Sequence, residues 1–337
     1  MPRRDRLQET LTSLGRVRQD PAAEASLAEL RRVLAREPSP AARKAAAIAG
    51  EAGLAVLVPD LRAAFFRFLE GPAANDRGCA AKAAVVEAFL RLEHDDDEVF
   101  RRGIRHVQME PVFGGRVDTA GDLRGASALG LARSPARDVL LELARLLADP
   151  EPPARVAAAR AIGSHGREAG LPLLRYKSLA GDEEPWVVTE CLLALLRLDP
   201  RGSLSFVAGF LEGQDAPGPA ASPERPRADR AECAATALGE SRLPEAFPVL
   251  REWYANAAAA RRPRVALLAL AALRRDESLG FLLSLVREAE PGPAAEAAQV
   301  LAGVAGDGAF PAKVREAASG RPDVLEAYER ARAVEGR

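Results

Sequence analysis

The sequence predicts an all-α fold, a right-handed solenoid of about eight helical hairpins that forms a single domain over residues 1–337. Three observations predict it. Small apolar residues recur in one pattern eight times, prolines precede several copies, and the chain is 48% hydrophobic but only 5% aromatic. A core of Ala, Leu and Val suits closely stacked helices, and a stacked repeat needs small residues at fixed helical offsets.

We number each copy from its first residue, which we call the slot. In the clearest copy, Arg155 is followed by Ala158, Ala159 and Ile162. Because offsets of three, four and seven lie on one helical face, we expect these residues to pack between successive hairpins. The eight slots are Arg43, Lys82, Arg124, Arg155, Val188, Ala231, Arg264 and Ala294.

Four copies carry a proline three residues before the slot, at Pro40, Pro152, Pro185 and Pro291. The first turn of a helix does not use its backbone N–H groups, so proline in this position marks a helix start. Acidic turns precede some of these prolines, as at residues 149–151, and carboxylates favour the positive end of a helix dipole. Each unit is therefore predicted as helix, tight turn, helix.

The repeats span residues 26–305, and we expect capping elements at residues 1–25 and 306–337. A terminal repeat without a cap would expose its stacking face. Residues 71–78 are expected to form an extended turn. The insertion at 212–228 is rich in proline and poor in apolar residues, which predicts a surface loop.

A second insertion, at residues 104–121, mixes apolar residues with polar ones. Alternation from Ile104 to Met109 predicts a short strand, and Gly114 with Gly115 predicts a tight turn. Thr119 and Asp122 are expected to form a capping box at the start of the next helix. The polar residues of this insertion form the richest constellation in the chain: Arg105, His106, Gln108, Glu110, Arg116 and Asp118.

Three hypotheses remain open for this insertion. Its polar residues could recognise a partner, which is the interpretation we favour. His106 and Glu110 could instead act as acid and base, since histidine titrates near neutrality. In the third hypothesis, the polar residues satisfy the loop backbone while four apolar residues plug the solenoid: Val107, Met109, Val112 and Phe113.

Residues 149–163 combine an acidic turn, a proline, arginine at the slot and the run Ala-Ala-x-Ala-Ile-Gly. This pattern resembles the HEAT repeat, in the short bacterial form also seen in HEAT-like bilin lyase subunits. The resemblance covers residues 26 to about 305. It implies an α-solenoid whose second helices line a concave face, but HEAT-like proteins include scaffolds, lyase subunits and a class of DNA glycosylases, so the fold does not decide function.

Positions +1, +2 and +5 after each slot are expected to face away from the packing and to line the concave face. They hold two basic and four acidic residues among small or apolar ones. A groove for a phosphate backbone needs several inward lysines or arginines, so this one favours a protein segment. From this strip we select Arg160 and Glu190, and we add Trp186 and Trp253 as candidate partner contacts. In the alternative, neighbouring helices bury part of the strip.

Charge and motifs narrow the function classes. The formal net charge is −1, from 47 basic and 48 acidic residues, so no bulk attraction to nucleic acid or anionic lipid is expected. The histidines lack the spacing of paired metal ligands, and nucleotide-binding and serine-hydrolase motifs are missing, so we expect no metal and no cofactor. Three widely spaced cysteines favour a reducing compartment.

We find no secretory signal and no apolar run of membrane-spanning length, and we expect a cytoplasmic monomer that does not bind membranes. The function we predict is a non-enzymatic scaffold that binds a protein partner along its concave face and around residues 104–121. The alternative is an enzyme or enzyme subunit, similar to the HEAT-like DNA glycosylases or to the bilin lyases.

Overall fold

A computed structural model describes residues 3–213, 227–257, 263–304 and 309–335. Within these ranges the protein is all-helical, with nineteen α-helices and a single two-stranded sheet. The core of the predicted loop at 212–228, residues 214–226, lies outside the described residues. None of the described helices is both long enough and apolar enough to cross a membrane.

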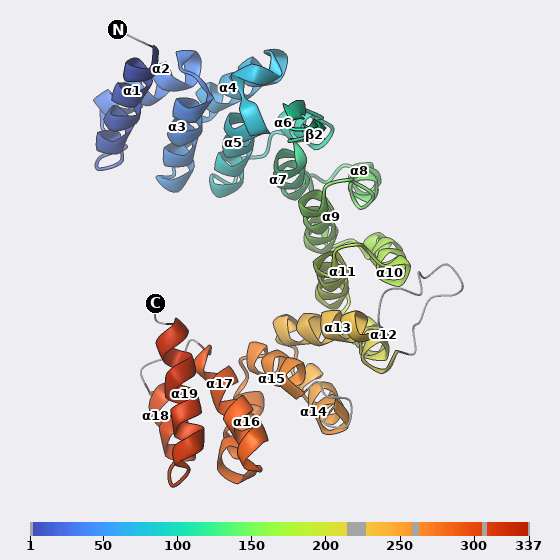
Figure 1. Ribbon diagram of the computed structural model, residues 1–337. Coiled ribbons are helices and arrows are strands. Elements are labelled where there is room, and N and C mark those ends of the chain that lie inside the picture. The colour runs from blue at the N-terminus through green and yellow to red at the C-terminus, as the bar shows by residue number, and fades with distance from the viewer. Residues whose placement is uncertain (1–2, 214–226, 258–262, 305–308, 336–337) are drawn as a thin grey trace. The chain divides into compact units, whose positions relative to one another are not determined.

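The chain divides into two compact units, Met1–Gly170 and Leu171–Arg337, which we describe separately (Figure 1). Unit 1 contains α1 (Arg3–Val17), α2 (Glu24–Arg36), α3 (Ser39–Glu51), α4 (Val58–Glu70), α5 (Ala80–Arg91), α6 (Asp97–Ile104), β1 (Met109–Val112), β2 (Gly115–Asp118), α7 (Gly121–Leu131), α8 (Val139–Leu146) and α9 (Pro152–His165). Short 3-10 turns lie at Ala55–Leu57, Ala73–Asn75, Arg77–Cys79 and Glu168–Gly170.

The described residues of unit 2 form helices joined by turns, without a strand. It contains α10 (Leu171–Ala180), α11 (Pro185–Leu198), α12 (Pro200–Glu212), α13 (Arg227–Ser241), α14 (Ala246–Ala257), α15 (Pro263–Ala272), α16 (Asp276–Glu288), α17 (Pro291–Ala302), α18 (Phe310–Ala317) and α19 (Pro322–Glu335).

Within each unit the odd-numbered helices pack in sequence order. In unit 1, α1, α3, α5, α7 and α9 each contact the next, and α2, α4, α6 and α8 pack behind them. In unit 2, α11, α13, α15, α17 and α19 do the same, with α10, α12, α14 and α16 behind. All eight predicted slots fall on odd-numbered helices from α3 to α17.

The predicted helix starts and packing residues are confirmed. Pro152, Pro185 and Pro291 each open a helix, and Pro40 lies in the first turn of α3. Ala158, Ala159 and Ile162 are completely buried. The helices approach so closely that a Cβ on Gly50 would lie 2.9 Å from the Cα atom of Ala88, which explains why the stacking positions are small.

One part of the predicted concave strip is wrong. The second position after the slot is buried in five repeats, at Ala45, Ala84, Glu190, Cys233 and Ala266. The physical reason is that, within a unit, an odd-numbered helix is contacted by its odd-numbered neighbours and by an even helix behind. Only a narrow stripe remains open, and positions such as Glu87, Arg160 and Thr236, five after the slot, lie on it.

Candidate functional site

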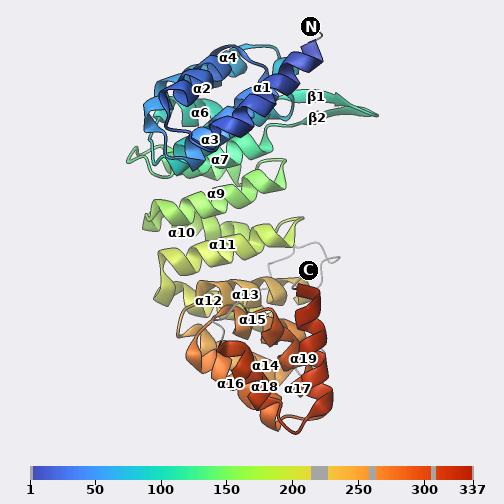
Figure 2. The ribbon, with the colours of Figure 1, turned by 90° about the vertical axis from the view of Figure 1, so that its left-hand side faces the viewer.

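The insertion at 104–121 folds as a β-hairpin that projects past the helix ends of unit 1 (Figure 2). The two strands pair antiparallel, with Met109 opposite Asp118 and Val112 opposite Gly115. Gly114 adopts φ of +88° in the turn, a conformation that glycine reaches without strain. The predicted turn is therefore confirmed.

The strand predicted from Ile104 to Met109 is wrong. Helix α6 begins where the Asp96 carboxylate caps it, accepting from the Val99 N–H at 3.0 Å. It continues through Ile104 because Phe100 and Ile104 bury a shared face. The strands lie further along, at 109–112 and 115–118. The capping box is also wrong, because the Thr119 hydroxyl bonds to the hairpin instead of to helix α7.

The apolar side chains of the hairpin are exposed. Phe113, at the turn, is fully exposed, and Val107, Met109, Val112 and Val117 are 40–61% exposed. They therefore do not fill the interior as the plug hypothesis required. The hairpin presents apolar residues to solvent, although exposed apolar surface is unfavourable in water.

The hairpin stands on a buried ion pair between Asp76 and Lys82, which are 0% and 1% exposed and 3.2 Å apart. The Asp76 carboxylate also accepts from the Ser39 hydroxyl at 2.6 Å and from the Ala81 N–H at 2.8 Å. The Gln108 side chain completes the cluster, accepting from Lys82 Nζ at 2.8 Å and donating to the Asp76 carbonyl at 2.7 Å. Residues 71–78 are thus not an extended turn but two 3-10 turns around a buried aspartate.

Glu110 ties strand β1 to the same region. Its carboxylate accepts from the Gly78 N–H at 2.7 Å, from Gln108 Nε2 at 2.6 Å and from the Thr119 hydroxyl at 2.9 Å. The hydrogen bond from Gly78, followed by those from the two side chains, lowers the pKa of Glu110 below its ordinary value. Glu110 is therefore ionised at neutral pH, and its carboxylate holds strand β1 against Gly78.

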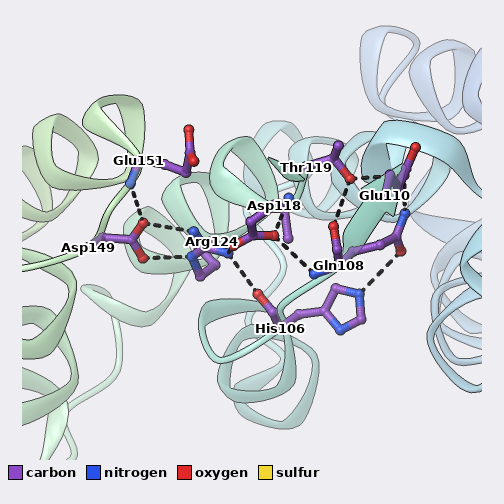
Figure 3. Close-up of polar contacts among 9 residues, drawn as sticks. His106, Gln108, Glu110, Asp118, Thr119, Arg124, Asp149 and Glu151 are labelled. Carbon is purple, nitrogen blue, oxygen red and sulfur yellow. Dashed lines mark hydrogen bonds and ion pairs between the residues drawn. The ribbon is translucent and has the colours of Figure 1, made fainter. Parts of the chain in front are cut away.

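Arg124, the slot residue of helix α7, holds the end of strand β2 (Figure 3). Its guanidinium makes two 2.7 Å hydrogen bonds to Asp149 and also donates to Asp118 at 2.6 Å and to the His106 carbonyl at 2.9 Å. Burial alone would raise the pKa of Asp118, but hydrogen bonds from two backbone N–H groups and from Arg124 hold it below its ordinary value. We call these contacts, with those of Asp76, Lys82, Gln108 and Glu110, the root of the hairpin.

His106 is half-buried beside the root. Its Nε2 atom lies 3.4 Å from Gln108 Oε1, and burial together with the charge of Lys82 lowers its pKa below 6.5. The imidazole is therefore neutral at pH 7. The acid and base hypothesis for His106 and Glu110 stays a prediction, and in the described structure Glu110 is committed to three hydrogen-bond donors.

Two arginines of the predicted site are exposed but bonded. Arg105 forms a two-pronged ion pair with Glu142 of helix α8, and this pairing lowers the pKa of that carboxyl. Arg116 reaches along the hairpin and donates to the Met109 carbonyl at 2.9 Å. Arg105 therefore connects the segment before the hairpin to the helical stack, and Arg116 covers the outer edge of β1.

A pocket of about 420 Å³ opens beside the root. Its walls combine apolar and charged residues, and three arginines are balanced by three carboxylates. It is lined by Ile104, Arg105, Val107, Met109, Asp118, Arg124, Glu142, Arg145, Leu146, Asp149 and Pro150. His106 is not among these lining residues.

The remaining predicted contacts lie elsewhere. Arg160 is exposed on helix α9 of unit 1. In unit 2, Trp186 is exposed at the start of α11, Trp253 is half-buried in α14, and Glu190 is buried with its carboxylate 3.5 Å from Arg197. Four of the six polar residues of the insertion are joined by hydrogen bonds, namely His106, Gln108, Glu110 and Asp118. Arg105 and Arg116 bond elsewhere, and Glu190 does not reach an open surface.

Comparison with protein-family models and with curated proteins finds no match for this chain. The HEAT likeness therefore stays a resemblance of motif. In the described residues, no group of three or more His, Cys, Asp and Glu side chains is arranged to hold a metal ion. The feature that bears on function is thus the geometry of the hairpin and its root.

Proposed function

We propose that the chain is a non-enzymatic, HEAT-like solenoid scaffold that binds another protein, with the hairpin of residues 104–121 as its main contact. The observation that carries this proposal is the contrast within the hairpin. Charged side chains are buried at the root, and apolar side chains are exposed along the strands and at Phe113. This is the reverse of the usual distribution and favours a binding element.

The root makes such an element usable. An isolated two-stranded hairpin is marginally stable in water, so its exposed residues would not keep one arrangement. Here Gln108, Glu110 and Asp118 are each bonded to residues of the helical stack. Because the strands are fixed before a partner arrives, less conformational entropy is lost on binding.

In each unit, the open stripe of the odd-numbered helices supplies a further surface. In unit 1 it presents Glu87 and Arg160, and in unit 2 Trp186 and Thr236. Charges of both signs among small residues suit a protein segment better than a phosphate backbone, which requires a band of positive charge. Retention on heparin together with a gel shift would support nucleic acid binding instead.

A capture experiment with two matched variants tests the proposal. Phe113→Ser removes the exposed aromatic ring from the hairpin, and Leu141→Ser removes another exposed apolar residue, from helix α8 of the same unit. We expect the wild type and Leu141→Ser to retain the same proteins from a lysate of the source cells, and Phe113→Ser to lose at least one. Identical sets from all three proteins would remove the hairpin from the proposal.

A further inference from the structure

The backbone of the hairpin has a definite hydrogen-bonding phase. The Thr119 N–H donates to the Gln108 carbonyl at 3.0 Å, and this pair continues the register in which Met109 lies opposite Asp118. Bonded and non-bonded pairs alternate along an antiparallel ladder. Glu110 and Val117 therefore form a bonded pair, and the backbone groups of Arg116 and Asp118 point outward from β2, as those of Met109 and Pro111 do from β1.

The two outer edges differ in what they offer. On β1, Pro111 has no N–H to donate, and the Met109 carbonyl is already occupied by the Arg116 guanidinium. Proline and a covering charged side chain are common ways of preventing strand addition. Strand β2 has no proline, and its outward N–H and C=O groups at Arg116 and Asp118 are those that an added strand would use.

Charge selects a register if the added strand is β2 of a second copy. A two-fold axis at residue 116 would place two arginines opposite each other, and an axis at residue 118 would place two aspartates opposite each other. An axis at Val117 instead avoids both like-charge pairs and sets Arg116 opposite Asp118 of the other copy, a carboxylate that also pairs with Arg124 of its own chain. Opposite charges in directly facing pairs stabilise a sheet, and like charges destabilise it.

The same register directs the hairpin turn to the pocket. With the axis at Val117, Gly115 of one copy lies opposite Thr119 of the other, so Phe113 lies beyond the end of strand β2 of the other copy, toward the start of its helix α7. Residue 121 opens helix α7, whose Arg124 lines the 420 Å³ pocket together with Met109, Leu146 and Pro150. Apolar walls and a guanidinium face suit a phenyl ring.

We propose that the chain forms a homodimer through β2, with Val117 facing Val117 on the two-fold axis and each Phe113 entering the pocket of the other copy. The proposal rests on the proposed function, because it names the occupant of the same hairpin surface. Pairing gives a four-stranded sheet that joins Val112 and Val117 of both copies on one face. Each buried phenylalanine adds about 150–250 Å² to the interface.

The interface is small compared with a standard complex of about 1,600 Å². The dimer is therefore reversible, and its population depends on concentration. It also replaces our expectation of a monomer. Sedimentation velocity of the full chain over a series of concentrations measures this equilibrium directly.

A pair of cysteine variants tests the register. Val117→Cys places thiols across the axis at a non-bonded pair, where Cα atoms lie about 4.5 Å apart, within disulfide range. Val112→Cys is the matched control, since Val112 and Val117 are 46% and 43% exposed but Val112 lies on the strand remote from the axis. The native Cys79, Cys191 and Cys233 are buried. We expect mild oxidation to cross-link Val117→Cys and not Val112→Cys.

A second experiment measures the dimer dissociation constant of Phe113→Ser. We expect it to be at least tenfold higher than that of the wild type. A wild-type chain that stays monomeric, or equal cross-linking of both cysteine variants, would overturn the dimer. If the monomer still captures proteins in a hairpin-dependent way, the proposed scaffold function stands and the self-pairing fails. A dimer whose capture of other proteins does not depend on the hairpin would support the self-pairing and overturn the hairpin as the scaffold's contact.

Discussion

The helical stack and the hairpin root of unit 1 are held together by opposite means. In the stack, small residues such as Ala158 and Ala159 are buried without polar partners and act through close packing. In the root, Asp76, Lys82 and Arg124 bury charge and satisfy it with directed hydrogen bonds. Apolar packing does not depend strongly on the orientation of the groups in contact, whereas hydrogen bonds do. The root therefore fixes the orientation of the hairpin relative to the helices of unit 1.

Breaking the buried ion pair is expected to have the largest effect. Lys82→Met leaves the Asp76 carboxylate buried without its cation and removes a donor to Gln108. Loss of one partner of a buried pair costs about 3–5 kcal/mol. Urea unfolding monitored by circular dichroism should show a free energy of unfolding reduced by this amount.

The double variant Lys82→Met/Asp76→Asn separates the pair from the packing around it. Asp76→Asn removes the stranded charge, so the double variant should be more stable than Lys82→Met alone. If Lys82→Met costs less than about 1 kcal/mol, the root is held by packing as the stack is, and the contrast between the two regions fails.

Substituting a stacking glycine probes the other half of the comparison. A Cβ on Gly50 would meet the Ala88 backbone at 2.9 Å, whereas a Cβ on Gly15 of helix α1 would meet only the Lys44 side chain, at 3.9 Å. Gly50→Ala should destabilise the protein by about 1–3 kcal/mol, as overpacking does. Gly15→Ala should be neutral or stabilising by up to about 1 kcal/mol, because alanine favours helix. Thermal unfolding of the two variants ranks them, and equal melting temperatures would show that the stack is looser than described.

The sequence was sufficient for the stack because the repeat is local. Small residues at +3, +4 and +7 and prolines at −3 act within a single helix, so their pattern is visible without the fold. Burial at +2 was predicted only as an alternative, because it depends on helices one repeat before and after. A helix contacted on three sides leaves a narrower stripe than an isolated amphipathic helix does.

The root was harder to predict because its partners come from different segments. Asp76 and Gln108 are 32 residues apart, and their contact follows from the stacking of α5 and α7. One signal was available: an acid stands six residues before the slot in each of the first five repeats, at Glu37, Asp76, Asp118, Asp149 and Asp182. The last three of these accept from the backbone N–H two residues on, at 2.9–3.0 Å, which forms a turn before the helix.

Acid should loosen the hairpin before it affects the stack. The pKa of Glu110 is lowered from 4.5, so the folded state favours the ionised carboxylate. Its contribution is fully present above pH 4.5 and is lost as the pH falls through the lowered folded value. Because Glu110 is partly exposed, the contribution is no more than about 1 kcal/mol.

Glu110→Gln should reproduce this loss at neutral pH. The difference in unfolding free energy between the wild type and Glu110→Gln should be largest above pH 4.5 and vanish at lower pH. Glu9→Gln, an exposed change in helix α1, is the control that should show no such trend. A difference that persists unchanged at acidic pH would mean that the carboxylate charge does not fasten β1.

Phe113→Ser should have the smallest effect on the fold. The side chain is fully exposed, and the turn geometry depends on Gly114 rather than on Phe113. Surface changes away from special features usually lie within about ±0.5 kcal/mol, so the unfolding free energy of the dilute protein should not move beyond that range. Measured below the association range, a loss greater than about 1 kcal/mol would place the ring against its own chain. An unchanged stability would mean that the fold does not need an aromatic ring at this exposed position, and that the ring is available to an intermolecular contact.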